Sequence, residues 1–410
     1  MLRTAAASGL GLFVPQLLRA ATATSDKRFV VVFAYGGWDT TRVFTDGFDN
    51  PAVDMEPAAD RLRVGNLSLV DGPGRPSVRA FFERHHADVA VLEGLLVPSV
   101  AHETCTQMMM TGGTRGTPDW AALLAGVAAD RYVLPNLVID GPSFPSQFGM
   151  AVARSGLNGQ LDGLIDGSRL SYNDEPLPLP SRSVQGAVDR YVARRAAAAQ
   201  QAAVSEAERL QLQKFAEAHR RAVDLEDARY ATTFGASNGF QGKLGVAVEA
   251  IATGLSRSVS LSFGSGAWDT HSDNDARQAP LWEELFAGLL ELREQLDTTT
   301  GTSGRPLSEE VVVLVLSEMN RTPGLNGDNG KDHWPYTSLM TWGPGIRGDR
   351  QVGGYDANFQ GRGIDLATGD LADGGVVPTT SHLGATLLAA NDLDPAEWLP
   401  GYPPIAALVE

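Results

Sequence analysis

Apolar runs alternate with helical patterns along most of the chain. Runs rich in β-branched and aromatic residues, bounded by turn residues, predict strands that are buried on both faces. They lie at 28–35, 88–95, 132–139, 258–263 and 310–317. The spacing of apolar residues between them predicts helices over 118–129, 240–255 and 281–296. Strands that alternate with helices predict an α/β fold: a three-layer sandwich with a central, mostly parallel sheet.

The segment 183–229 interrupts this alternation. It is rich in Ala, Arg, Glu and Gln, which favour helix, and it has little β character. The stretch "NDEPLPLPSRS" (173–183) is typical of a linker leading into it. We interpret 183–229 as a helical insertion of solvated surface helices, carried by a single domain over 24–410.

The first 23 residues differ from the rest of the chain. Arg3 precedes an apolar stretch over 5–18, and the small residues at 21–23 are typical of a cleavage site. This pattern predicts an export signal, and "LRTAAASGLGLFVPQLL" resembles the second half of a twin-arginine signal. No later stretch reaches about 18 apolar residues. We therefore expect an exported, periplasmic or extracellular protein that is not an integral membrane protein.

Composition and charge exclude some partners. The 410 residues are 43% hydrophobic, enough for a large core, and the formal net charge is −16. Nucleic-acid binding needs Lys and Arg gathered on one face, and the sequence has no such cluster. The single cysteine, Cys105, cannot form an internal disulfide.

Carboxylates and imidazoles gather where predicted strands end. They follow the strands at 28–35, 258–263 and 310–317, and a further loop over 326–338 brings two more. The residues are Asp39, Asp269, His271, Glu318, Asp332 and His333. Ligands of open α/β sheets bind outside the carboxyl ends of the strands, so we expect these side chains to meet at one edge.

Asp and His donors together suit zinc, manganese or iron, whereas calcium and magnesium prefer oxygen ligands alone. The sequence therefore predicts a divalent metal, zinc or manganese, at this edge. Each residue taken alone also fits an ordinary role. Asp39 after a Gly-Gly turn fits a turn or a helix cap, and His271 near a tryptophan fits a packed, hydrogen-bonded residue. Asp332 fits either a metal ligand or a carboxylate that orients His333.

Several stretches carry a resemblance to a known family. They are Trp-Asp-Thr at 38–40 and 268–270, "VLVLSEMNRTPGLNGDNGKDHW" (313–334) and "TTSHLGATLLAANDLD" (379–394). From about Phe29 onward the chain resembles the bacterial exported family called domain of unknown function 1501, within the alkaline phosphatase and sulfatase superfamily. The resemblance implies that superfamily's fold and its metal site at the strand ends.

The resemblance also assigns individual residues. It places Asp39, Asp269 and His271 at metal-ligand positions of the superfamily. Glu318 and His333 fall at further ligand positions, and Met319 stands where the superfamily has a histidine.

The resemblance places His102 where the superfamily has its nucleophile, a serine, a threonine or a cysteine converted to formylglycine. The stretch "CTQMM" lacks the Pro and Arg of the sulfatase motif, so we expect Cys105 to be a buried, unmodified residue.

Two interpretations of the function stay open. In one, the protein is an exported metal-dependent hydrolase of small-molecule or polymer-linked phosphate or sulfate esters. Hydroxide supplied by the metal attacks, His102 acts as ligand or general acid/base, and Arg321 stabilises negative charge. In the other, it is a catalytically inactive metal- or anion-binding or assembly protein on the same fold.

Overall fold

The computed structural model describes residues 26–114, 116–155, 180–228 and 239–410, so the predicted export signal lies outside the described residues. Within these ranges a central sheet has eight strands in the order β12-β4-β11-β8-β1-β7-β5-β6. The strands are β1 (Arg28–Ala34), β4 (Val89–Leu96), β5 (Asn136–Val138), β6 (Val152–Arg154), β7 (Ser258–Phe263), β8 (Val311–Leu316), β11 (Tyr336–Trp342) and β12 (Arg350–Gly353). All neighbouring pairs are parallel except those that β11 makes with β4 and β8.

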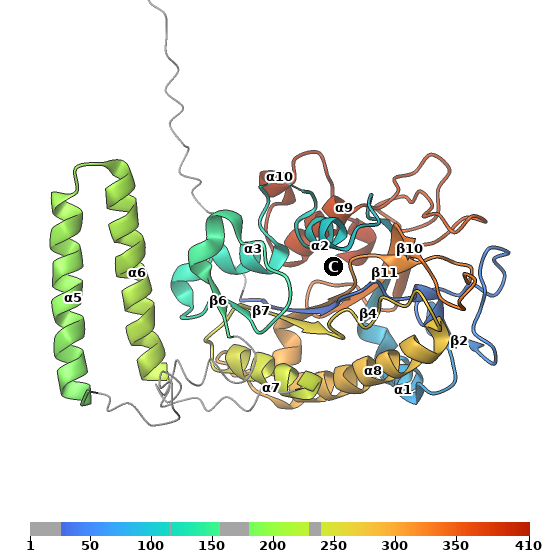
Figure 1. Ribbon diagram of the computed structural model, residues 1–410, viewed down its shortest axis with the longest axis horizontal. Coiled ribbons are helices and arrows are strands. Elements are labelled where there is room, and N and C mark those ends of the chain that lie inside the picture. The colour runs from blue at the N-terminus through green and yellow to red at the C-terminus, as the bar shows by residue number, and fades with distance from the viewer. Residues whose placement is uncertain (1–25, 115, 156–179, 229–238) are drawn as a thin grey trace, which may run out of the picture.

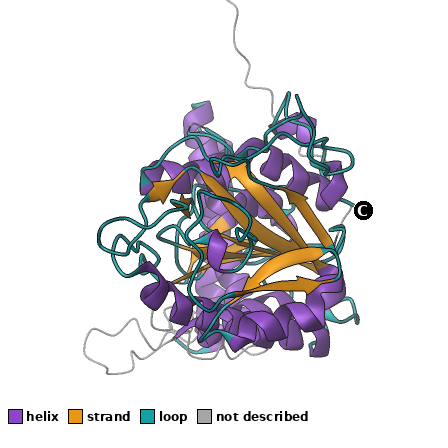
Figure 2. Ribbon diagram, turned by 90° about the vertical axis from the view of Figure 1, so that its right-hand side faces the viewer, coloured by secondary structure: helices purple, strands orange, loops and turns teal. Residues whose placement is uncertain are grey.

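Helices cover both faces of this sheet (Figures 1 and 2). One layer contains α1 (Pro76–His85), α7 (Gly239–Ala252) and α8 (Asn274–Thr298), and the other contains α2 (His102–Thr111), α3 (Trp120–Gly126), α9 (Thr380–Ala390) and α10 (Pro395–Trp398). Every residue of β1, β7 and β8 is buried, as expected for strands covered on both sides. The predicted three-layer α/β fold with a mostly parallel sheet is thus confirmed.

Smaller elements complete the described chain. Two antiparallel pairs flank the main sheet: β2 (Asp60–Val64) with β3 (Leu67–Asp71), and β9 (Asn320–Arg321) with β10 (His333–Trp334). Short 3-10 turns occur at Thr40–Arg42, His86–Asp88, Ala129–Arg131, Ser146–Ala151, Leu307–Glu309 and Ala406–Leu408. None of the helices within the described ranges is long and apolar enough to cross a membrane.

All five predicted strands are present, although one is shorter than expected. The apolar run at 132–139 forms strand only over Asn136–Val138, because Pro135 has no N–H to donate to a neighbouring strand. The predicted helix over 118–129 begins at Trp120, since the side chain of Asp119 caps it by accepting from the amide of Ala122.

Two long helices, α5 (Arg182–Ala202) and α6 (Glu206–Ala228), occupy most of the segment 183–229. They pack against each other and stand beside the main body in Figure 1. Arg221 of α6 donates to the backbone carbonyl of Met150. The division of the chain into one domain and an insertion stays a prediction.

An aromatic cluster fixes the loops that follow β1 and β7. The ring of Trp282 on α8 lies 5.0 Å from that of Trp38 and 4.8 Å from that of Trp268, measured between ring centroids. All three side chains are fully buried. Because Trp38 and Trp268 each directly precede an aspartate, this packing holds Asp39 and Asp269 in place.

Candidate metal centre

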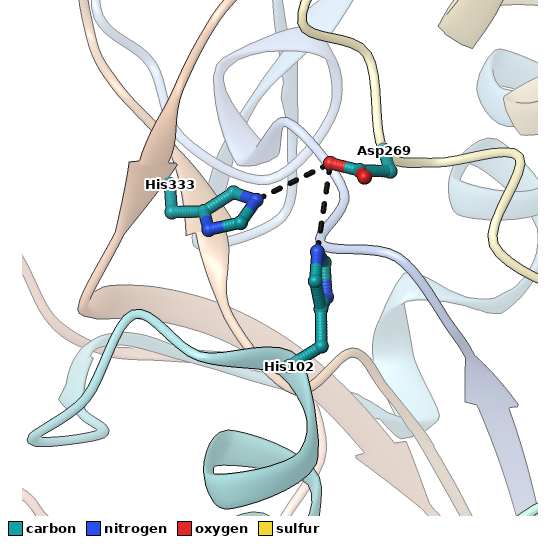
Figure 3. Close-up of side chains that lie close together, drawn as sticks. All are labelled: His102, Asp269 and His333. Atoms are coloured by element: carbon teal, nitrogen blue, oxygen red, sulfur yellow. Dashed lines mark hydrogen bonds and ion pairs between the residues drawn. The ribbon is translucent and has the colours of Figure 1, made fainter.

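Side chains from three separate segments meet at the carboxyl edge of the sheet. His102 is the first residue of α2, Asp269 lies in the loop after β7, and His333 begins β10. Figure 3 shows the two imidazoles directed at the carboxylate of Asp269. The ligand atoms of these three residues all lie within 4.8 Å of one another.

A third imidazole, that of His271, joins this group. Its Nε2 lies 3.0 Å from Oδ1 of Asp269, and the corresponding distances are 3.3 Å for His333 and 3.5 Å for His102. The Nε2 atoms of His271 and His333 are 3.1 Å apart. Three ring nitrogens therefore converge on one carboxylate oxygen.

Each of these histidines holds its other ring nitrogen against an oxygen. The Nδ1 pairs are His102 with Glu318 Oε1 (2.7 Å), His271 with Asp332 Oδ1 (2.8 Å) and His333 with the carbonyl of Val100 (2.7 Å). A carbonyl or an ionised carboxylate only accepts, so each Nδ1 carries the proton and donates it. In the neutral form each Nε2 is then left with a lone pair that points at the centre.

The donor atoms fit a divalent metal. Two lone pairs that face each other at 3.1 Å need a cation between them, which is a proton or a metal. His102 Nε2 is buried and has no hydrogen-bond partner among the described residues, which is unusual for a polar atom. The ligands of a tetrahedral zinc lie roughly 3.3 Å apart, because Zn–N bonds are about 2.0–2.1 Å. The distances from Oδ1 of Asp269 to the three Nε2 atoms, 3.0–3.5 Å, and the 3.1 Å between His271 and His333 match that spacing. His271 stands outside the compact group formed by His102, Asp269 and His333.

Arg321 fixes the carboxylate of the centre. Burial alone would raise the pKa of Asp269, but the hydrogen bond and charge of Arg321 Nη2, 2.7 Å away, outweigh it and lower the pKa to about 2. Asp269 is therefore ionised at any pH near neutrality.

The guanidinium of Arg321 is fully buried, and it also donates to the carbonyls of Gly36, Gly37 and Lys331. We expected Arg321 to stabilise negative charge on a substrate. Its donors instead hold the loop after β1 together, because those buried carbonyls need partners, so it acts as a positioning residue.

Asp39 lies in a separate, fully buried cluster of charges. Its carboxylate accepts from Lys331 Nζ at 2.8 Å, from Asn274 Nδ2 at 2.9 Å and from Thr41 Oγ1 at 2.6 Å. Burial opposes ionisation, but Lys331 and Arg42 lower the pKa of Asp39 well below its usual range. An ammonium thus compensates this carboxylate, which also caps the 3-10 turn at Thr40–Arg42.

Glu318 orients His102. Its side chain is fully buried and accepts from the amide of Gly36 at 2.9 Å and from Ser317 Oγ at 3.0 Å, besides His102. The hydrogen bond that His102 Nδ1 donates to Glu318 is the largest cause of the raised pKa of His102. Cys105, one turn further along α2, is buried, and burial raises the pKa of its thiol to about 11, so the thiol stays protonated.

The family model described as "Protein of unknown function (DUF1501)" matches residues 72–365. The chain belongs to this family. The expected family is therefore confirmed. No curated protein matches the chain.

Several solved structures resemble this DUF1501 chain. The lipoteichoic acid synthase LtaP from Listeria monocytogenes is 9% identical with a TM-score of 0.40, over 95% of this chain and 77% of that one. The PsFucS1 sulfatase from Pseudoalteromonas sp. is 11% identical with a TM-score of 0.37, over 94% and 72%. The phosphonate monoester hydrolase of Agrobacterium radiobacter is 11% identical with a TM-score of 0.31, over 92% and 78%. At these identities and TM-scores the likeness says nothing about activity.

The structure sorts the expected site residues of this DUF1501 chain into three groups. Asp269, His271 and His333 meet at the centre, together with His102. Glu318 and Asp332 contact the Nδ1 atoms of histidines instead, and the partner of Asp332 is His271 rather than His333. Asp39 lies with Lys331. Sequence reasoning missed Lys331, whose one signal was its place inside the stretch 313–334.

Proposed function

We propose that this protein binds one divalent metal on His102, His271, His333 and Asp269 and uses it to hydrolyse phosphate or sulfate esters. The observation that carries the proposal is the convergence of three Nε2 atoms, each with its Nδ1 bonded to an oxygen, on Oδ1 of Asp269. This arrangement is the one that metal-binding histidines adopt in proteins, where a carboxylate or carbonyl behind the ring fixes the tautomer.

The charges around the centre support a divalent ion. Three imidazoles, which must be neutral to bind a metal, are surrounded by the carboxylates of Asp269, Glu318 and Asp332 and by the guanidinium of Arg321. Three negative charges and one positive charge leave a net −2, which a divalent cation neutralises. Zinc fits three imidazoles and one carboxylate better than manganese, and calcium prefers oxygens alone.

A bound divalent metal supplies a Lewis acid that polarises an ester oxygen and lowers the pKa of water. The residues of the chain hold and orient it. Glu318 fixes the ring of His102, and Arg321 fixes Asp269. Helix α2 begins at His102 without a side-chain cap among the described residues, so the positive end of its dipole faces the centre and favours an anionic ester.

The test is metal-dependent turnover of an aryl phosphate and an aryl sulfate by protein purified without chelator. We expect activity that chelation abolishes and that zinc or manganese restores. His102→Ala should lower it by roughly a hundredfold or more, the scale of losing a positioned ligand or acid/base group.

His102 also motivates the second candidate, a metal- or anion-binding protein without turnover, because an imidazole stands where the superfamily has an alcohol. His102→Ser separates the two. In a hydrolase it lowers the activity, whereas in a binding protein it puts an alcohol at that position and creates weak turnover from none. A wild-type protein with no turnover on a broad ester panel, with any divalent metal, refutes the hydrolase.

We also propose export through the twin-arginine pathway, on the pattern of the first 23 residues. A reporter fused to the N-terminal region of the protein should be exported only when that pathway is intact. Export that continues after deletion of the pathway contradicts this proposal.

A further inference from the structure

Apart from the metal centre, a polar pocket of about 580 Å³ lies near the β12 edge of the sheet. We call it the Glu93 pocket. It is lined by β4, β12, the end of the β2–β3 hairpin and the loops over 45–51 and 355–359, and it shares no lining residue with the metal centre. Its described lining includes Asp46, Asp49, Glu93 and Asp356 but no lysine, arginine or histidine.

Two carboxylate oxygens in this pocket lack partners. Glu93 is 8% exposed, and its Oε1 has no hydrogen-bond partner in the described part of the chain. Oδ1 of Asp46 is likewise buried and unpartnered within the described ranges, while its Oδ2 accepts from Ser68 and pairs with Arg61. A buried acceptor without a donor costs about 1–3 kcal/mol, and more when it is charged, so such atoms point to a missing ligand.

The hydrogen-bond donors around the pocket are already engaged within the protein. The side-chain amides are bonded in this way: Asn50 to the carbonyl of Asp356, Asn66 to Asp349, and Gln351 to the carbonyls of Phe44 and Ser68. The hydroxyls of Thr45 and Tyr355 contact Ser338. The pocket thus offers acceptors and negative charge, so its ligand must donate hydrogen bonds and carry positive charge.

A metal ion fits this pocket poorly. Among the described residues, the carboxylates of this pocket do not belong to a group of three or more His, Cys, Asp or Glu ligands close enough to hold an ion, whereas residues of the metal centre do. An ammonium needs fewer charged partners, because it donates three hydrogen bonds in a flexible geometry. The volume of about 580 Å³ also leaves room for a carbon chain or ring beside it.

We propose that the Glu93 pocket binds an organic primary amine, with the ammonium held by Glu93 Oε1 and Asp46 Oδ1. Burial, with a smaller contribution from the nearby charge of Asp46, raises the pKa of Glu93 to about 7, and hydrogen bonds that Thr45 and Gln351 also make to Glu93 offset only part of that rise. An ammonium beside Glu93 offsets the free-energy cost of burying its negative charge.

The test compares 1,4-diaminobutane with 1,4-butanediol, which has nearly the same size but no charge, by titration calorimetry near pH 8. We expect the diamine to bind the full chain and the diol to bind at least about tenfold more weakly, a difference of about 1.4 kcal/mol. Glu93→Gln and Asp46→Asn should each weaken diamine binding about tenfold or more. Glu309→Gln, an exposed carboxylate outside the pocket, should leave it unchanged.

The proposal is overturned by no binding of the diamine up to about 10 mM, by equal binding of the diol, or by a diamine affinity that neither variant changes. Calcium binding that Glu93→Gln abolishes also overturns it in favour of a metal. Thermal unfolding of each variant shows that it is folded, so a lost affinity reports on the pocket.

Discussion

The histidines of the metal centre depend on the oxygens behind them. Glu318 is buried behind His102, and its charge favours the Nδ1–H tautomer that leaves Nε2 free for a metal. Glu318→Gln keeps an acceptor for Nδ1 but removes this charge. We predict a 10- to 100-fold lower zinc affinity for this variant, roughly the cost of changing such a partner, measured by competition with a zinc-binding dye. Asp328→Asn, an exposed carboxylate in the neighbouring loop, is the matched control. Equal affinities for Glu318→Gln and wild type contradict the role given to Glu318.

Lys331 and Asp39 form a fully buried ion pair, and the other buried cation near Asp39, Arg42, lies further away at 3.6 Å, so removing Lys331 leaves the buried charge of Asp39 with weaker compensation. Lys331→Met should lower the free energy of unfolding by up to about 3–5 kcal/mol, the upper end applying only if Arg42 compensates little, measured by urea denaturation. The double variant Lys331→Met with Asp39→Asn should recover much of that loss, because no charge is then left unpaired. A double variant that is destabilised by the sum of the two single effects would show that the pair acts through packing alone.

Glu93 makes the stability of the protein depend on pH. Its pKa rises from 4.5 to about 7 in the folded state, so the folded protein binds more protons than the unfolded chain between these values. Stability due to this group therefore falls as the pH rises from about 4.5 to about 7 and is lowest above that. Glu93→Gln should raise the free energy of unfolding at pH 8 by up to about 3 kcal/mol and have a much smaller effect at pH 5. A difference between variant and wild type that is the same at both pH values would contradict the buried, neutral Glu93.

At the scale of elements, the sequence predicted best the strands that are buried on both faces along their whole length. Strands β1, β7 and β8 lie in the middle of the sheet, so their residues are apolar and β-branched almost throughout. Strand β11 escaped prediction because it mixes Thr and Ser into a buried strand. The hydroxyl of Thr341 is accommodated by donating to the carbonyl of Val313, a contact that no local pattern reveals.

The metal centre was predictable only in part, because some of its contacts join residues far apart in the sequence and leave no local pattern. Asp269 and His271 follow directly from one strand end, and His333 from a loop close to another. The pairing of His102 with Glu318 joins residues 216 positions apart, so it depends on how α2 is placed against β8. The use of Lys331 to compensate Asp39 likewise depends on tertiary structure.

The hairpin of α5 and α6 has exposed apolar side chains and few contacts with the sheet layers. We predict that replacing residues 182–228 by a Gly/Ser linker leaves metal content unchanged and shifts the melting temperature by less than about 3 °C, since few buried contacts are lost. Calorimetry and metal analysis of the shortened chain check this. Loss of metal or a much lower melting temperature would show that the hairpin supports the main fold.

For the whole molecule, the proposed metal joins loops that follow separate strands. A ligand that binds only the folded state stabilises it, so the metal should also raise the melting temperature. The net charge of −16 makes the loss of a cation from this edge unfavourable as well.

The most direct test is elemental analysis of protein purified without chelator, alongside the single variants His271→Ala and His333→Ala. We predict about one zinc or manganese ion per wild-type chain and well below about 0.2 in each variant, since each substitution removes a ligand. Wild-type protein that carries no metal, and that shows no binding when titrated with zinc or manganese, would contradict this prediction.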